Sequence, residues 1–192
     1  MIKTKANNNR VALIVGIEKY EDSPVASYAN MDAKFFYEND LNQTLQKWRK
    51  KLSSIVFQSE VGSLLQKTER VASLCKALAI YTGANPLLAH RAGQLSKSDL
   101  MSDVVREFDE LQGVMGKYFA LSQGFEEDVS HAIREHYLPI SISSSVPKKP
   151  ISCALSIIDK LDTLVGFYLI NEKPTSSKDP FALRRAAIGL LR

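Results

Sequence analysis

Three histidines and two cysteines are the side chains of this 192-residue chain that could bind a transition metal or act as a nucleophile. His131 and His136 are five residues apart, which on a helix places them about 140° apart around the axis, so they cannot bind one ion together. Cys75 and Cys153 lie in separate apolar patterns, without the histidine partner that a reactive thiolate needs. The sequence therefore predicts two free thiols, no metal site and no catalytic residue.

Lysines and arginines gather in two clusters that could contact the phosphates of a nucleic acid. The candidate RNA-binding residues are Lys47, Arg49, Lys50, Lys51, Lys178, Arg184 and Arg185. Two alternatives stay open: the clusters are solvated helix faces, or the two terminal arginines pair with carboxylates such as Asp159 and Asp162. Asp179 could also cap the helix that starts there, in the place of a phosphate.

Nucleotide chemistry is not indicated by any motif. The chain has neither a phosphate-binding loop nor a glycine-rich dinucleotide fingerprint. We therefore expect this chain to bind no cofactor of its own.

These residues must be positioned by helices, because apolar residues recur every three to four positions over most of the chain. Helices are expected at residues 32–52, 59–79, 87–101, 103–119, 128–137 and 151–170, and again from Asp179, with Asp179 as the N-cap and Pro180 as the first helical residue. A serine-rich surface loop is expected at residues 141–150. The predicted fold is all-α, with one core that contains Leu95, Val104, Leu111, Leu155, Leu161 and Leu164.

One short segment departs from this pattern. Residues 11–17 are mostly β-branched and predict a buried strand, but no comparable strand follows with which it could pair. Its pairing is therefore left open.

Composition agrees with a globular protein of one domain, or of one domain with an appendage. The chain is 45% hydrophobic and 24% charged, with a net charge of +4. The longest apolar stretch, residues 151–170, is interrupted by charges, which favours a buried helix over a membrane span. The first ten residues are polar and contain no apolar signal core, so a cytoplasmic location and no membrane partner are expected.

Three separate motifs resemble the beta subunit of the bacterial-type glycyl-tRNA synthetase. They occur in the expected order at residues 97–116, 159–164 and 179–185. The resemblance covers residues 32–192, and the segment 1–31 is expected to be a separate appendage.

The resemblance implies a function in tRNA charging. In that family an alpha subunit makes glycyl-adenylate from glycine and ATP, and the beta subunit helps to bind tRNA. We therefore expect a piece of a ligase, truncated at both ends and not catalytic by itself. Its expected partners are the alpha subunit and tRNA, and ATP is expected to be used by the whole enzyme.

The middle of the chain also resembles an HD-type domain, the fold of many metal-dependent phosphohydrolases. Such enzymes place a histidine ahead of an Arg-Val pair, a His-Asp doublet on a later helix, and a distant aspartate. The corresponding residues here are Lys67, Ser96, Lys97 and Asp159, of which only Asp159 matches a ligand. An ammonium group repels a divalent cation, so the hydrolase site is expected to be degenerate, with Lys97 paired to Asp159 instead. A working phosphohydrolase of this type is the alternative function.

Residues 10–35 separately resemble the first strand and helix of caspase-like peptidases. The later histidine and cysteine elements of such enzymes have no counterpart in this chain. A non-catalytic fusion or scaffold protein with a caspase-like head is therefore the third possibility.

Overall fold

The computed structural model describes residues 34–141, 143–175 and 178–192, and it confirms the all-α prediction. The predicted strand at residues 11–17 lies outside the described residues, as does nearly all of the caspase-like segment. Within the described ranges, the only strands are β1 (Val56–Gln58) and β2 (Gly62–Ser63), which form a small antiparallel hairpin.

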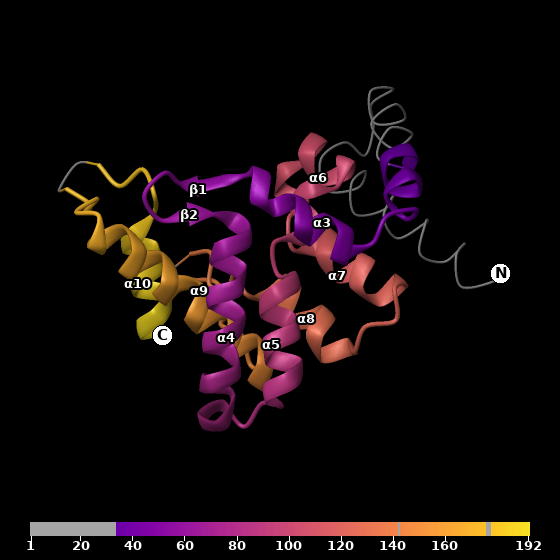
Figure 1. The fold of residues 1–192 in the computed structure, drawn as a ribbon. Helices are drawn as coiled ribbons and strands as arrows, with labels where there is room; N and C mark the ends of the chain where they lie inside the picture. The colour runs from indigo at the N-terminus through magenta and orange to yellow at the C-terminus, as the bar shows by residue number, and fades with distance from the viewer. Residues whose placement is uncertain (1–33, 142, 176–177) are drawn as a thin grey trace.

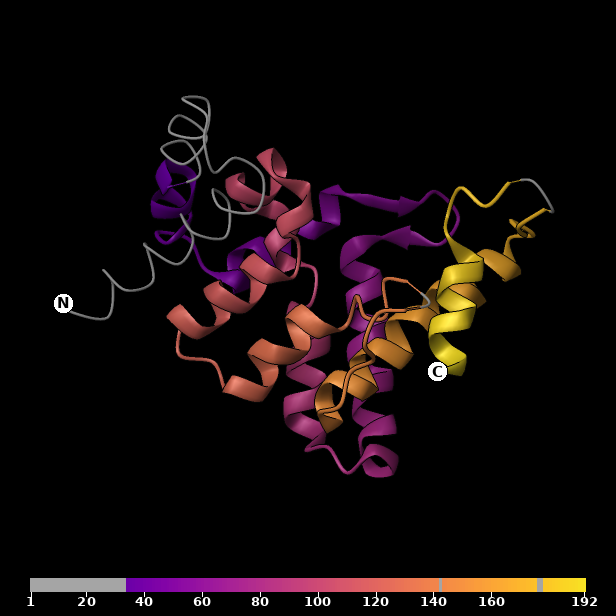
Figure 2. The same cartoon turned by 180° about the vertical axis from the view of Figure 1, so that it is seen from behind.

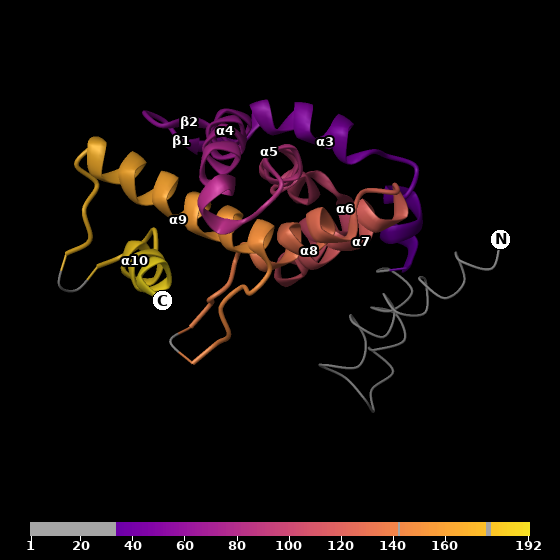
Figure 3. The same cartoon turned by 90° about the horizontal axis from the view of Figure 1, so that it is seen from below.

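Three helices form the centre of the molecule. α4 (Leu64–Thr82) and α5 (Pro86–Leu95) form a helical hairpin, and α9 (Pro150–Leu169) crosses behind both. Figure 2 shows α9 from the other side, in front of the hairpin. In the view along the hairpin, α9 extends from the neighbourhood of α8 (Glu127–Glu135) to the far side of α4 (Figure 3).

The ends of these helices are fixed by local sequence. Ser63 and Gln66 form a capping box at the start of α4, with each side chain bonded to the other residue's backbone N–H. Asn85 caps α5 by accepting hydrogen bonds from the N–H groups of Leu87 (2.9 Å) and Leu88 (3.2 Å). Both α5 and α9 begin with proline, which has no N–H to leave unpaired there.

The helix predicted for residues 103–119 is wrong as one continuous element. It is divided into α6 (Asp103–Glu107), a 3₁₀ turn (Asp109–Leu111) and α7 (Val114–Ser122). Gly113 has φ of +76°, which ends any helical continuation, and its N–H donates to Asp99 Oδ2 at 2.5 Å. The N–H of Gly116 donates to the same oxygen at 3.1 Å, so one buried carboxylate fixes the start of α7.

The predicted helix at residues 59–79 begins later than expected, because residues 62–63 pair with β1 and α4 starts at Leu64. The helix predicted for residues 87–101 is likewise shorter, since α5 ends at Leu95 and a 3₁₀ turn occupies Ser98–Met101. After α5, the Ser102 hydroxyl donates to the carbonyl of Asp99 and accepts from the N–H of Val105, so it bonds to backbone groups that a continuous helix would otherwise pair.

The core lies between the α4–α5 hairpin, α7, α8 and α9, and most of the predicted core residues are in it. Leu95, Val104, Leu111 and Leu155 are buried as predicted. The prediction for Leu161 is wrong, because this side chain is 38% exposed on the outer face of α9. Leu164, also predicted to be buried, is only partly so. α9 is apolar around most of its circumference, so its sequence period alone does not identify the buried face.

The terminal helix, α10 (Leu183–Leu191), packs on α9 and begins later than predicted. The prediction that Asp179 is the N-cap residue is wrong, because Ala182 occupies that position. The Asp179 carboxylate nevertheless accepts hydrogen bonds from the N–H groups of Leu183 (2.8 Å) and Arg184 (3.0 Å) at the start of the helix. Pro180 lies in a turn before the helix, so the prediction that it is the first helical residue is wrong. No helix in the described parts of the chain is long and apolar enough to cross a bilayer.

Candidate functional site

Asp159 lies at the centre of a buried group of charges contributed by separate segments. Its Oδ1 is 3.3 Å from Lys67 Nζ on α4, and its Oδ2 is 3.2 Å from Lys97 Nζ, just after α5. Lys67 is 2% exposed and Lys97 is 7% exposed. The Lys97–Asp159 ion pair expected from the sequence is therefore present, and Lys67 makes a second pair with the same carboxylate.

Lys97 makes two further contacts on the side of α8. Its Nζ lies 2.7 Å from His136 Nε2 and 4.0 Å from the centre of the Tyr137 ring. Nδ1 of His136 donates to the carbonyl of Ile133 at 2.7 Å, so Nε2 is the neutral acceptor for the ammonium. Burial and the adjacent Lys97 lower the pKa of His136 to about 3. His136 thus serves as a neutral partner of a buried cation.

Lys67 is bound from the other side by the next turn of α9. Its Nζ donates to Asp162 Oδ2 at 3.1 Å and to Thr163 Oγ1 at 2.8 Å. Asp162 also accepts two hydrogen bonds from the guanidinium of Arg70, at 2.7 and 3.2 Å. This bidentate pair closes the network on the side of the β1–β2 hairpin.

Lys160 is a third lysine of this region, and it is satisfied by oxygen atoms without a formal charge. Its Nζ donates to the carbonyls of His136 (3.0 Å) and Leu138 (2.6 Å) and to Ser156 Oγ (2.8 Å). Burial lowers the pKa of Lys160 to about 8, because its Coulomb attraction to Asp159 offsets only part of the desolvation.

The electrostatics of the cluster favour an ionised Asp159. Burial alone would raise the pKa of this carboxyl, but Lys97 and Lys67 together outweigh it and hold the pKa below its ordinary value. A divalent cation does not fit here, since two ammonium groups already occupy both oxygens of the carboxylate. Within the described ranges, no three His, Cys, Asp or Glu side chains are arranged to hold a metal ion.

Of the four residues aligned with the HD-type site, three come together and one does not. Ser96 lies in the interior and donates to the carbonyl of Gly93 at 3.0 Å, away from the cluster. His136 and Asp162 belong to the cluster but were not predicted to. No sequence pattern distinguished these two residues, because a single histidine or a single aspartate on an apolar helix also occurs where it makes no buried ion pair.

The basic residues near residue 48 lie on α3 (Leu45–Lys51). Lys47, Lys50 and Lys51 are exposed, while Leu45 and Trp48 face the core. Arg49 is half-buried and makes an ion pair of 3.5 Å with Glu69. This face therefore presents three lysines to solvent.

The basic residues near the end of the chain lie on and before α10. Lys178, Arg184 and Arg185 are all exposed. Asp159 and Asp162 are already paired with Lys67, Lys97 and Arg70, so the predicted alternative of internal pairing with the α10 arginines is wrong. The guanidinium of Arg184 bonds to the carbonyl of Thr175, and Asp179 occupies the helix N-terminus where a phosphate could have bound. In Figures 1 and 3, α3 and α10 lie apart, with α4 and α9 between them.

Comparison with known proteins decides the family. The family model described as "Glycyl-tRNA synthetase beta subunit" matches residues 26–192. The chain belongs to this family. The resemblance noted from the three sequence motifs is thereby confirmed, and the hydrolase alternative is not favoured.

Relatives in this family share nearly half of their residues with the chain over the matched region. The glycine–tRNA ligase beta subunit of Paracoccus denitrificans is 49% identical over 164 residues, which is 84% of this chain and 24% of that protein. The beta subunit of Dinoroseobacter shibae is 43% identical over 192 residues, or 98% of this chain and 26% of that protein. The chain thus spans about a quarter of the length of these relatives.

Proposed function

We propose that this chain is a helical part of a glycine–tRNA ligase beta subunit that helps to bind and position tRNA in the cytoplasm. The ATP-dependent transfer of glycine is assigned to a partner alpha subunit. Two features support the proposal: membership of the beta-subunit family, and basic residues on α3 and α10 that the fold leaves exposed. Arginine and lysine contacts to phosphate are the usual source of tRNA affinity.

The RNA-binding part of this proposal depends on one observation: the buried carboxylates are paired with buried cations, and the basic residues of α10 take no part in that network. The buried carboxylates of α9 are paired by Lys67, Lys97 and Arg70. Arg185 and Lys178 therefore remain available to an external polyanion. The buried cluster in turn joins α4, α9 and the segments that follow α5 and α8, which gives the exposed cations a rigid support.

Charge reversal of the α10 arginines tests this function. The double variant Arg184→Glu with Arg185→Glu should weaken tRNA binding by roughly tenfold or more at moderate salt, because the phosphate contact of Arg185 becomes repulsive and the positive charge of Arg184 beside it is reversed as well. The matched control is Lys76→Glu with Arg106→Glu, which changes the net charge equally on exposed positions of α4 and α6. Binding is measured by fluorescence anisotropy with labelled tRNA, and helix content by circular dichroism.

Equal weakening by both double variants would mean that only the total charge matters, and would contradict a binding face on α10.

The catalytic part of the proposal has its own test. The purified chain should not glycylate tRNA with glycine and ATP unless an alpha subunit is supplied. Glycylation by the chain alone would contradict the proposed division of roles.

A further inference from the structure

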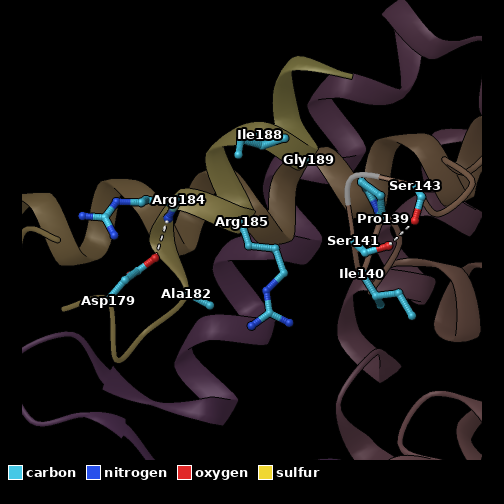
Figure 4. Close-up of a pocket in the computed structure, with 10 residues that line it drawn as sticks. All are labelled: Pro139, Ile140, Ser141, Ser143, Asp179, Ala182, Arg184, Arg185, Ile188 and Gly189. Carbon is cyan, nitrogen blue, oxygen red and sulfur yellow. Dashed lines mark hydrogen bonds between the residues drawn. The ribbon is translucent and has the colours of Figure 1, made fainter. Parts of the chain in front are cut away.

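A pocket of about 630 Å³ lies between the start of α10 and the loop that follows α8 (Figure 4). α10 contributes Arg185, Ile188 and Gly189 to one wall, and the loop contributes Ile140 and nearby serines to the other. This volume falls within the range of pockets that hold small ligands. The residues that line the pocket do not include Asp159, Lys67 or Lys97.

The walls of the pocket are held in place by Lys160, which lies behind both of them. The ammonium of Lys160 binds the carbonyls of His136 and Leu138, immediately before the loop wall begins at Pro139. Its aliphatic stem packs against Gly189, where an added Cβ would be 2.9 Å from Lys160 Cε. The same added Cβ would lie 3.3 Å from Pro139 Cδ, so the glycine lets α10 approach both Lys160 and the first residue of the loop wall.

The described serines of the loop wall are joined by hydrogen bonds. Ser141 and Ser144 bond to each other through backbone N–H groups and hydroxyls, and Ser141 Oγ is 3.3 Å from Ser143 Oγ. The guanidinium of Arg192 donates to the carbonyl of Ser141 at 3.2 Å, which ties this loop to the end of α10. The pocket is thus built from both elements.

The chemistry of the lining is an apolar surface with one available cation. Ile140 is 59% exposed and Ile188 is 42% exposed, so each wall of the pocket carries a branched apolar side chain that is open to solvent. Figure 4 shows Arg185 projecting from α10 into the same space, while Arg184 points away from it. In the part of the chain that the structure describes, Arg185 has no carboxylate partner, whereas Asp179 is occupied by the backbone of α10.

We infer that this pocket binds a single unpaired nucleotide of the tRNA. The base would lie between Ile140 and Ile188, the phosphate would contact the Arg185 guanidinium, and the Ser141 and Ser143 hydroxyls would face the ribose. An unstacked base is flat, largely apolar on its faces and linked to an anion, which matches an apolar slot with one cation at its edge. In a base-paired duplex the bases stay stacked on one another. They therefore cannot enter the space between the two isoleucines, and only the phosphates of the duplex could contact Arg185.

This inference rests on the proposed function, and its test separates the two. Binding of three labelled RNAs to the chain is measured at low salt: tRNA, a short duplex, and a single strand of the same length as the duplex. The variant Ile140→Ser removes an apolar wall in a surface loop without changing charge. Ile80→Ser, at a 77% exposed position on α4, is the matched control.

Ile140→Ser should weaken binding of the single strand by roughly fivefold or more and leave duplex binding within about twofold, with Ile80→Ser changing neither. AMP should compete with the single strand better than ribose 5-phosphate, because only AMP carries a base. Unchanged single-strand affinity for Ile140→Ser, or equal competition by the two small phosphates, would overturn the pocket assignment while leaving tRNA binding intact. Failure of all three RNAs to bind would overturn the proposed function and this inference together.

Discussion

Asp159 is the residue on which the buried charges depend, because its two carboxylate oxygens lie 3.3 and 3.2 Å from the ammonium groups of Lys67 and Lys97. The variant Asp159→Asn would leave Lys67 and Lys97 buried without this shared counter-charge. We expect it to lower the free energy of unfolding by about 3–5 kcal/mol, the usual cost of leaving a buried charge unpaired. Urea denaturation followed by circular dichroism measures this difference.

Lys97→Met is the informative comparison, since Asp159 would keep Lys67 as a partner. Its expected cost is smaller, about 1–3 kcal/mol, from the unpaired Nε2 of His136 and the altered packing. Glu69→Gln, which breaks the exposed pair with Arg49, should cost less than about 1 kcal/mol. If Lys97→Met proves as damaging as Asp159→Asn, the carboxylate is not the centre of the network.

The neutral His136 makes stability depend on pH in a defined direction. Its pKa is about 3 in the folded chain against 6.5 ordinarily, so only the unfolded state takes up this proton as the pH falls below 6.5. Stability due to His136 is therefore complete above pH 6.5 and is lost towards pH 3, by about 2 kcal/mol at pH 5. His136→Gln keeps a donor and an acceptor but cannot titrate, so its stability should fall less over this range.

Asp99 acts in the opposite direction and must be separated from this effect. Burial raises the pKa of Asp99 to about 6, so the folded state takes up its proton first and gains stability as the pH falls from 6 towards 4. The difference between the wild-type and His136→Gln curves cancels this contribution. Parallel curves from pH 7 to pH 4 would show that His136 is not held neutral.

At the scale of elements, the α4–α5 hairpin depends on one close contact. An added Cβ on Gly93 would lie 2.6 Å from the Cα of Ala72 and 2.9 Å from its N, and backbone atoms cannot move aside as a flexible side chain can. Gly93→Ala should therefore destabilise the chain by about 2–4 kcal/mol, despite the better helix propensity of alanine. Thermal and urea unfolding both report this change.

Gly166→Ala is the matched control in α9. Its added Cβ would meet only the side chain of Val61, with Cγ1 at 3.1 Å and Cγ2 at 3.6 Å, and these side-chain atoms can shift. Stability should change by less than about 1 kcal/mol, because the gain in propensity offsets the contact. Similar losses in both variants would show that the hairpin crossing is not specially close.

The period of apolar residues predicted α4, α5, α8 and α9 because each of these helices buries one face. It failed at the β1–β2 hairpin and between α6 and α7, where tertiary hydrogen bonds to residues such as Asp99 decide the backbone. The pairing of Lys97 with Asp159 was predictable from the HD-type resemblance. The places of His136 and Asp162 were not, because they depend on how α8 and α9 pack against α4.

At the scale of the whole molecule, the distribution of charge matters more than the net charge of +4. The exposed lysines of α3 and the cations of α10 lie apart, so a large polyanion such as tRNA could contact both. Two to four phosphate contacts predict roughly a ten- to hundredfold loss of tRNA affinity for a fourfold rise in salt. Anisotropy titrations over a series of KCl concentrations measure this slope.

Reversing the charges of Arg184 and Arg185 should make that slope shallower as well as lower the affinity, because fewer counterions are then released. The control variant with Lys76 and Arg106 reversed should keep the slope of the wild type. A slope near zero for the unmodified chain would show that its tRNA binding, if present, is not electrostatic.

The two ammonium groups beside Asp159 have a consequence for how this fold is maintained in a cell. A cation supplied by a side chain cannot be removed by a chelator, exchanged for a different metal or limited by metal supply. It is present in a fixed ratio of two to each chain from the moment of synthesis. The positive charge at this position is therefore independent of metal supply, and metal starvation does not affect it.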